Sequence, residues 1–477
     1  MKNATPIDRG YLRSIPAGDE EKAERMRCSA LEKCHSKVIV LDDDPTGTQT
    51  VHDVPVYTDW NKETMLCAFE EPDRVAYFLT NSRAMTQAQT EEVHRQIATS
   101  IAFAAGKSKK NYILISRSDS TLRGHFPLET ETLREALCAL GEPDFDGEII
   151  YPFFLEGGRY TINGVHYVLE EDRLIPAGQT EFAKDKSFGY TASFLPEWCA
   201  EKSKGKWAAD SVFTIPLEEL RTQAYETITE RLMRVSDFAK VVVDSVDYTD
   251  VKVFIAAYLQ AVARGKRFMF RSAAAVPKVL GGISDQALLG KEEIFDPTNH
   301  NGGLIVVGSH VQKTSRQLRA LQMSDLPIRF IQFDQHRVLE TNGLKDEARR
   351  VGEEVEDDLL AGYTTVVYTR RDRLDLDTDD AERQLEVSVQ ISEAITSIVA
   401  NLKVRPRFII AKGGITSSSI ATDALRVRRA IVMGQVFPGI PVWETGEESK
   451  FPRMPYVIFP GNVGGEETLL DIVRGLV

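Results

Sequence analysis

The sequence has few cysteines, no long apolar run and no excess of positive charge. The five cysteines among 477 residues are scattered and form no CxxC pair, which argues against a zinc site or a disulfide framework and favours a reducing cytoplasm. No apolar run approaches the length of a membrane span, and the N-terminus lacks the apolar core of a signal peptide. The net charge of -13 argues against binding to bulk nucleic acid or to an anionic membrane. It leaves room for a nucleotide, which needs only a local positive pocket.

Length and composition predict a globular protein of two domains. A chain of 477 residues exceeds one ordinary hydrophobic core, and 42% apolar with 27% charged residues is typical of a folded chain. Short apolar runs alternate with helical patterns, which predicts an α/β fold: two domains, each a mostly parallel sheet flanked by helices, with an active-site cleft between them. We expect an N-terminal arm over residues 1–36, a first domain over 37–290 and a second over 291–477. The turn-rich segment 273–301 would be the hinge.

An acidic turn follows the first predicted strand. Residues 38–41 form a β-branched apolar run that suits a buried parallel strand, and Asp42, Asp43 and Asp44 come directly after it. Three carboxylates at one strand end repel one another, so they cost folding free energy unless a metal, a substrate or a cation accompanies them. Because ligands of open α/β sheets bind at this edge, the turn is predicted to be one wall of an active site.

A second polar tip follows the predicted strand at residues 112–116. Asp119, Ser120 and Thr121 offer short polar groups suited to a polyol. Three arginines, one after a predicted strand at residues 74–80 and two after the strand at 112–116, are suited to holding a carboxylate by bidentate hydrogen bonds. Each group taken alone is also explained by a capped turn or a surface ion pair. The arginines are Arg83, Arg117 and Arg123.

Small residues replace charged ones at the strand tips of the second domain. Gly413 and Gly414 follow a buried strand, with Thr416 at the start of the next predicted helix. Glycines let backbone N–H groups approach an anion, and a helix start adds partial positive charge, so the turn predicts phosphate binding; a plain Ser/Thr-capped turn is the alternative. Similar tips at residues 308–309 and 460–465 favour a nucleotide pocket, although no GxxxxGK[ST] loop occurs.

Three functions fit these motifs. In the first, the N-terminal domain binds a small polar acid, the C-terminal domain binds ATP, and phosphate passes between them. In the second, the DxDxT pattern of Asp42, Asp44 and Thr46 is that of a haloacid-dehalogenase-like phosphatase, with Asp42 as nucleophile and Asp44 as general acid. That alternative leaves the glycine tips without a role. The third is a ligand-binding sensor of two α/β lobes, which would need no acidic cluster.

The motifs, in their order, resemble the four-carbon acid sugar kinases. In that family a strand precedes Asp-Asp-x-Thr-Gly, and later blocks end in Ser-Arg and in Asp-Ser-Thr-x-x-Gly. Its nucleotide-binding domain carries Gly-Ser, Gly-Gly-x-Thr and Gly-Asn-x-Gly turns. The resemblance covers nearly the whole chain except residues 1–36. The six motifs begin here at Asp43, Ser82, Asp119, Gly308, Gly413 and Gly461.

The resemblance implies ATP-dependent phosphorylation of a threonate- or erythronate-like acid, or of its oxo form. The sequence departs from many members at Pro45 and Gln49, which leaves the identity of the acid open. The residues implied to contact ATP are Ser309, Gly413, Gly414, Ile415, Thr416 and Gly461. Those implied to contact the acid are Asp43, Thr46, Gly47, Arg83, Ser120, Thr121 and Arg123.

We expect direct in-line transfer of the phosphate. An acidic side chain, Asp44 in preference to Asp119, orients or deprotonates the substrate hydroxyl. Mg²⁺ and the backbone N–H groups of the glycine tips neutralise the charge that develops on the phosphates. The expected partners are therefore small molecules, ATP and a sugar acid, and the sequence leaves open whether the chain forms a homo-oligomer.

Overall fold

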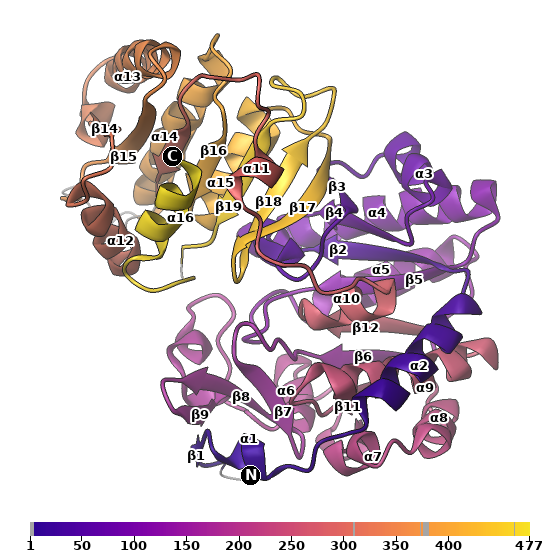
Figure 1. Cartoon of the computed structure of the whole chain (residues 1–477). Helices are drawn as coiled ribbons and strands as arrows, with labels where there is room; N and C mark the ends of the chain where they lie inside the picture. Colours follow the sequence, from indigo (N-terminus) through magenta and orange to yellow (C-terminus); the bar gives the residue numbers. More distant parts are fainter. Residues whose placement is uncertain (1–3, 309–310, 373, 375–380, 462) are drawn as a thin grey trace. The chain divides into compact units, whose positions relative to one another are not determined.

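The computed structural model describes residues 4–308, 311–372, 374, 381–461 and 463–477 (Figure 1). The chain divides into two compact units. The N-terminal unit comprises Met1–Val51 and Asp59–Asp285, and the C-terminal unit comprises His52–Thr58 and Gln286–Val477. The seven residues 52–58 thus belong to the C-terminal unit, although the chain before and after them belongs to the N-terminal unit. No motif in the sequence indicates this seven-residue excursion.

A sheet of parallel strands forms the centre of the N-terminal unit. Its spatial order is β10-β11-β6-β12-β5-β2-β4, and every neighbouring pair is parallel. Most of these strands are buried along their whole length, as a parallel sheet covered by helices requires. The strands are β2 (Lys37–Asp42), β4 (Val75–Leu79), β5 (Tyr112–Arg117), β6 (Gly147–Tyr151), β10 (Phe213–Ile215), β11 (Ala239–Val243) and β12 (Phe268–Ser272).

Helices cover this sheet through their apolar faces. The longest, α4, starts at a capping box in which Thr86 and Gln89 satisfy each other's backbone N–H groups, and it packs against α3 and α5. Helix α2, within the predicted N-terminal arm, packs on α9 and buries Ala23 and Leu31. The helices are α1 (Tyr11–Ser14), α2 (Glu20–Glu32), α3 (Lys62–Glu70), α4 (Gln87–Ser108), α5 (Leu128–Ala139), α6 (Leu195–Lys202), α7 (Leu217–Arg221), α8 (Tyr225–Met233), α9 (Tyr248–Ala263) and α10 (Ala275–Gly281).

A small antiparallel sheet of order β1-β9-β8-β7 belongs to the same unit. Its strands are β1 (Ile7–Asp8), β7 (Arg159–Ile162), β8 (Val165–Glu170) and β9 (Arg173–Pro176). Its core is aromatic, because Phe126 and Trp198 stack with ring centroids 4.5 Å apart beside Val168 and Leu195. The sheet is held against the strand tips of the large sheet by Ser245, which pairs with Thr161.

The C-terminal unit has a mixed sheet of order β3-β17-β18-β19-β16-β13-β15-β14. The pairs from β3 to β19 are antiparallel, and those from β19 to β14 are parallel. Strand β3, from the seven-residue excursion, is its first strand. The strands are β3 (Val54–Tyr57), β13 (Leu304–Val307), β14 (Ile328–Phe333), β15 (Thr364–Thr369), β16 (Ile409–Lys412), β17 (Arg429–Phe437), β18 (Ile440–Thr445) and β19 (Pro455–Phe459).

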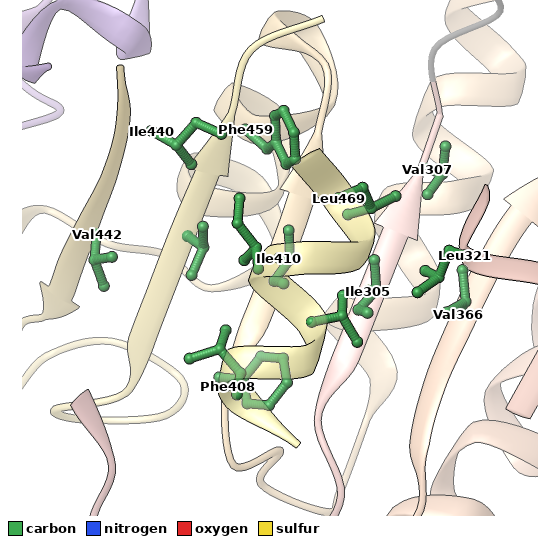
Figure 2. Close-up of a cluster of buried hydrophobic side chains, with 14 of the residues drawn as sticks. Ile305, Val307, Leu321, Val366, Phe408, Ile410, Ile440, Val442, Phe459 and Leu469 are labelled. Atoms are coloured by element: carbon green, nitrogen blue, oxygen red, sulfur yellow. The ribbon is translucent and has the colours of Figure 1, made fainter. Parts of the chain in front are cut away.

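Apolar side chains from these strands and from the C-terminal helix form the core of this unit (Figure 2). Ile305 and Ile410 lie on adjacent strands and pack with Leu469 of α16, which also contacts α12. The helices are α11 (Lys291–Ile294), α12 (Gln312–Gln322), α13 (Gly343–Leu360), α14 (Ala381–Asn401), α15 (Gly414–Ser419) and α16 (Thr468–Leu476).

These two units confirm the predicted α/β class, with mostly parallel sheets flanked by helices. The segment 273–301, predicted as an irregular hinge, contains the short helices α10 and α11, because Ala275, Val276 and Leu280 bury an apolar face. Among the described helices, none combines the length and the apolar character needed to cross a bilayer.

Candidate functional site

The acidic turn lies where β2 ends, and its shape depends on a glycine. A Cβ at Gly47 would lie 1.7 Å from Oδ2 of Asp42, so no other residue fits this position without displacing Asp42. The turn Pro45–Thr48 is a short 3₁₀ helix that Asp44 caps, with Thr46 N donating to Asp44 Oδ1 at 2.8 Å. The three carboxylates are therefore held apart in defined directions.

Two arginines neutralise the acidic turn. Arg83 donates from Nε and Nη2 to the two carboxylate oxygens of Asp43, at 3.1 and 2.5 Å, and Nη1 lies 3.3 Å from Asp44 Oδ2. Arg117, which pairs in register with Asp42 across β5 and β2, donates to Asp42 Oδ1 at 3.1 Å. These bidentate and buried pairs offset the cost of placing charges in the interior.

The three aspartates differ in their ionisation. Burial, opposed by Arg117, raises the pKa of Asp42 to about 7. Burial also raises the pKa of Asp43, despite Arg83. Burial would raise the pKa of Asp44 too, but Arg83 and the hydrogen bonds from Thr46 outweigh it and hold that pKa below its usual range. Asp44 is therefore the carboxylate of the turn that stays ionised most readily.

The second predicted tip is anchored by its backbone and presents its side chains. His166 bonds through Nε2 to the carbonyl oxygen of Ser120 at 2.8 Å, and Tyr190 donates to that of Thr121 at 2.6 Å. Asp119 accepts from Arg123 Nε at 2.6 Å and from the Thr121 hydroxyl. Burial would raise the pKa of Asp119, but Arg83 and Arg123 outweigh this effect and hold that pKa well below its usual range.

The structure brings the two tips of the N-terminal unit together. Arg83, which binds Asp43 and Asp44, also acts electrostatically on Asp119. A Cβ at Gly124 would lie 3.4 Å from Asp43 Oδ2, so the end of the second tip lies against the acidic turn. The residues predicted to contact the acid therefore lie in the acidic turn, in the second tip, or, for Arg83, beside both.

Two arginines beside these tips, Arg271 buried and Arg159 half-buried, form no ion pair with an acidic side chain among the described residues. Arg271, 2% exposed, donates to the carbonyl oxygen of Arg123 at 3.1 Å and lies over the Trp198 ring. Arg159 lies 5.7 Å from the centre of the Phe182 ring, and its Nε has no hydrogen-bond partner. With Phe182 it lines a cavity of about 490 Å³. Neither arginine could be predicted from the sequence, because a single arginine on a strand has no distinguishing pattern.

Three small-residue tips of the C-terminal unit leave adjacent parallel strands at one level. Val307, Lys412 and Phe459 are in register across β13, β16 and β19, so the residues that follow them lie side by side. A Cβ at Gly308 would lie 2.5 Å from Oγ1 of Thr416, which shows how closely two of the tips approach.

The central tip begins at a glycine whose backbone conformation favours glycine over other residues. Gly413 has φ +122°, a conformation that L side chains rarely adopt. Ser417 is buried and donates to the carbonyls of Ala411 and Gly413, whereas Ile415 is 68% exposed, so the tip reaches the surface at Ile415. Gly461 follows β19 in the neighbouring tip. The remaining predicted ATP contact, Ser309, lies outside the described residues.

No group of three or more His, Cys, Asp or Glu side chains suited to a metal ion occurs in the described parts of the chain.

Comparison with protein families gives two matches that together cover most of the chain. The family described as "Sugar-binding N-terminal domain" matches residues 38–280. The family described as "Nucleotide-binding C-terminal domain" matches residues 304–469. The acidic turn thus lies in a sugar-binding domain, and the glycine tips lie in a nucleotide-binding domain.

Solved structures share the fold. A Haemophilus influenzae protein of the DUF1537 family has 18% identity and a TM-score of 0.62, covering 92% of this chain and 100% of its own. A putative tRNA synthase from Salmonella typhimurium has 15% identity and a TM-score of 0.62, covering 92% and 99%. A search of curated proteins gave no match. By its two matched domains in this order, the chain belongs to the four-carbon acid sugar kinase family.

Proposed function

We propose that the protein is an ATP-dependent kinase that transfers the γ-phosphate to a hydroxyl of a four-carbon sugar acid, threonate- or erythronate-like, or of its oxo form. The observation that carries this proposal is the pairing of a sugar-binding domain, whose strand tips hold ionised carboxylates and arginines, with a nucleotide-binding domain, whose tips carry small residues. The first set suits a polyol with a negative charge, and the second suits phosphate.

Asp44 is proposed as the residue that receives the hydroxyl proton. The hydroxyl oxygen of the acid attacks the γ-phosphorus, the bond from that phosphorus to the bridging oxygen of ADP breaks, and the proton passes to the Asp44 carboxylate. Asp44 suits this role because it is ionised and its direction is fixed by the cap on Thr46. Asp119 is the second candidate; Arg123 and Thr121 bond its Oδ2, as Thr46 and Arg83 bond Oδ1 and Oδ2 of Asp44.

The arginines divide into those that build the site and those left for the substrate. Arg83 donates its N–H groups to Asp43 and Asp44, so its proposed contribution is to orient the turn. Arg123 bonds Asp119 through Nε, and its Nη1 lies 3.8 Å from Asp185. The guanidinium of Arg159, which forms no ion pair with an acidic side chain among the described residues, is a further donor for a substrate carboxylate. The other proposed contacts to the acid are Thr46, Gly47, Ser120 and Thr121.

The nucleotide is proposed to bind through the backbone of the three glycine tips. Backbone N–H groups of residues 414–416 would donate to the phosphate oxygens, whereas that of Gly413 already donates to the carbonyl oxygen of Phe459 at 2.9 Å. Mg²⁺, when bound with the nucleotide, would neutralise charge that develops during transfer. The proposed contacts are Ser309, Gly413, Gly414, Ile415, Thr416 and Gly461.

The phosphatase alternative requires Asp42 to be an accessible nucleophile. Asp42 is 2% exposed, is paired with Arg117, and accepts from the backbone N of Asp44 at 3.3 Å. A carboxyl so enclosed cannot approach phosphorus without breaking these contacts, so we favour the kinase.

A coupled assay of ADP release against a panel of three- to six-carbon sugar acids tests the proposal. We expect turnover that depends on a four-carbon acid and is absent with the corresponding polyol that lacks the carboxylate. ATP-independent hydrolysis of p-nitrophenyl phosphate would instead support the phosphatase, and nucleotide consumption with none of the acids would refute the assigned substrate class.

A further inference from the structure

Lys412 is a buried lysine between two of the glycine tips of the nucleotide-binding domain. It is the last residue of β16 and is 0% exposed. Its Nζ donates to the carbonyl oxygen of Pro460 at 2.8 Å and lies 3.6 Å from the centre of the Phe459 ring. Both acceptors belong to β19 and to the tip that follows it. Lys412 therefore ties the 413–416 tip to the 460–465 tip.

This ammonium group has no carboxylate partner among the described residues. An ammonium group offers three donors, and a buried one is costly unless its charge is compensated. The ionisable group that acts on it is a second cation, Lys313 of α12. At the same turn, the hydroxyls of Ser417 and Tyr456 donate to backbone carbonyls and bring no negative charge. Burial, and then Lys313, lower the pKa of Lys412 to about 7.

The missing negative charge is supplied if phosphates bind on the adjoining turn. Gly413 follows Lys412 directly, and Gly308 of the third tip lies against Thr416. An anion on these tips would approach the buried ammonium across a medium of low dielectric, where the attraction is strong. The carbonyl of Pro460 would meanwhile keep the ammonium directed between the tips.

We propose that Lys412 is a positioning residue for the phosphates of the nucleotide: it ties the 413–416 tip to Pro460, and its neutral amine takes up a proton from solvent to become an ammonium group when the phosphates bind. This inference rests on the nucleotide site proposed above and adds a residue and a proton to it. A purely structural lysine would join the tips equally well but would not change its protonation on binding.

Calorimetric titration of the full chain with ADP and Mg²⁺ tests the proton, at pH 8 in two buffers of different ionisation enthalpy. The phosphates of ADP are already ionised at this pH, so proton uptake reports on the protein. We expect the wild-type chain to take up close to one proton per ADP, because most of Lys412 is neutral before binding. ADP binding without proton uptake would overturn this inference and leave the nucleotide site intact, whereas no ADP binding would overturn both.

Three variants assign the proton to Lys412. Lys412→Met should abolish the uptake and weaken ADP binding on the order of tenfold or more, because a charge-assisted contact is lost. Lys412→Arg, which stays charged, should restore affinity to within a few-fold of wild type but not the uptake. Lys450→Met is the matched control, because Lys450 also donates to a backbone carbonyl, that of Ala400, and lies outside the tips. Uptake that persists in Lys412→Met would refute the assignment.

Discussion

The strand tips of the two domains differ in composition: those of the sugar-binding domain carry charged side chains, and those of the nucleotide-binding domain carry small residues. In the sugar-binding domain, the 42–47 turn presents charged side chains, and each is fixed by a partner: Asp43 by Arg83, Asp42 by Arg117. In the nucleotide-binding domain, the tips carry small residues, and at Gly308 a side chain would collide, because its Cβ would lie 2.5 Å from Oγ1 of Thr416. A side chain that binds a ligand must be held in place by neighbouring groups. A backbone N–H group that binds a ligand must instead be left uncovered by neighbouring side chains.

This difference has a consequence for mutation. A change in the acidic turn should alter the chemistry or the stability of the sugar-binding domain, because its charges depend on one another. A change in a glycine tip should alter nucleotide affinity and leave the rest of the chain unaffected. Four substitutions, from the largest expected effect to the smallest, examine this contrast.

Asp44→Asn should lower turnover about 10³-fold, because the amide keeps the size of the side chain and the acceptor for Thr46 N but cannot take the hydroxyl proton. The affinity for ADP should stay at the wild-type value. Both are measured on the same preparation, by coupled ADP release and by calorimetric titration. Asp172→Asn, at an exposed position of the turn between β8 and β9, is the matched control. Full turnover by Asp44→Asn would remove Asp44 from the mechanism and leave Asp119 as the candidate.

Gly47→Ala should destabilise the protein by about 3 kcal/mol, because the new methyl group forces Asp42 away from its ion pair with Arg117. Urea denaturation measures the effect. Gly106→Ala in α4 is the control, since nothing lies within 4 Å of its Cβ position. An alanine there should be neutral or stabilising by up to about 1 kcal/mol. Equal stability of the two variants would show that the acidic turn tolerates repacking.

Gly414→Asp should weaken ADP binding about 10- to 100-fold, through repulsion between its carboxylate and the phosphates. Stability and the binding of the sugar acid should remain at wild-type values, because the residue lies on the tip rather than in the core. Gly352→Asp on α13, where nothing lies within 4 Å of the Cβ position, adds the same charge elsewhere in the domain. Unchanged ADP affinity in Gly414→Asp would contradict the placement of the phosphates.

Much of this contrast could be predicted from the sequence, because it depends on local pattern. A β-branched run followed by three aspartates, or by two glycines, indicates both the strand and the kind of tip. The partners of those residues could not be predicted. Arg117 meets Asp42 only through the register of β5 on β2, and Lys412 meets Pro460 only through that of β16 and β19. That His52–Thr58 belongs to the C-terminal unit likewise depends on the pairing of β3 with β17, for which the sequence has no local signal.

Asp42→Asn should change the pH dependence of stability. Burial raises the pKa of Asp42 in the folded protein to about 7, above its usual value of 3.8. Between these values the folded chain holds a proton that the unfolded chain releases, so this carboxyl makes stability fall as pH rises from about 4 to about 7. Its contribution to the slope is at most about 1.4 kcal/mol per pH unit.

The asparagine variant should therefore lose that part of the slope and gain stability relative to wild type as the pH approaches 7. Urea denaturation at intervals between pH 4 and pH 8 measures it, and Gly106→Ala, which changes no ionisable group, should keep the wild-type slope. ADP affinity should not change, since Asp42 belongs to the acidic turn and not to the glycine tips. If the slope of Asp42→Asn equals that of wild type, Asp42 is ionised throughout, and Arg117 compensates its burial fully. Charge compensation in the acidic turn would then be complete without substrate, and would contrast with Lys412, which is proposed to become charged only when the phosphates bind.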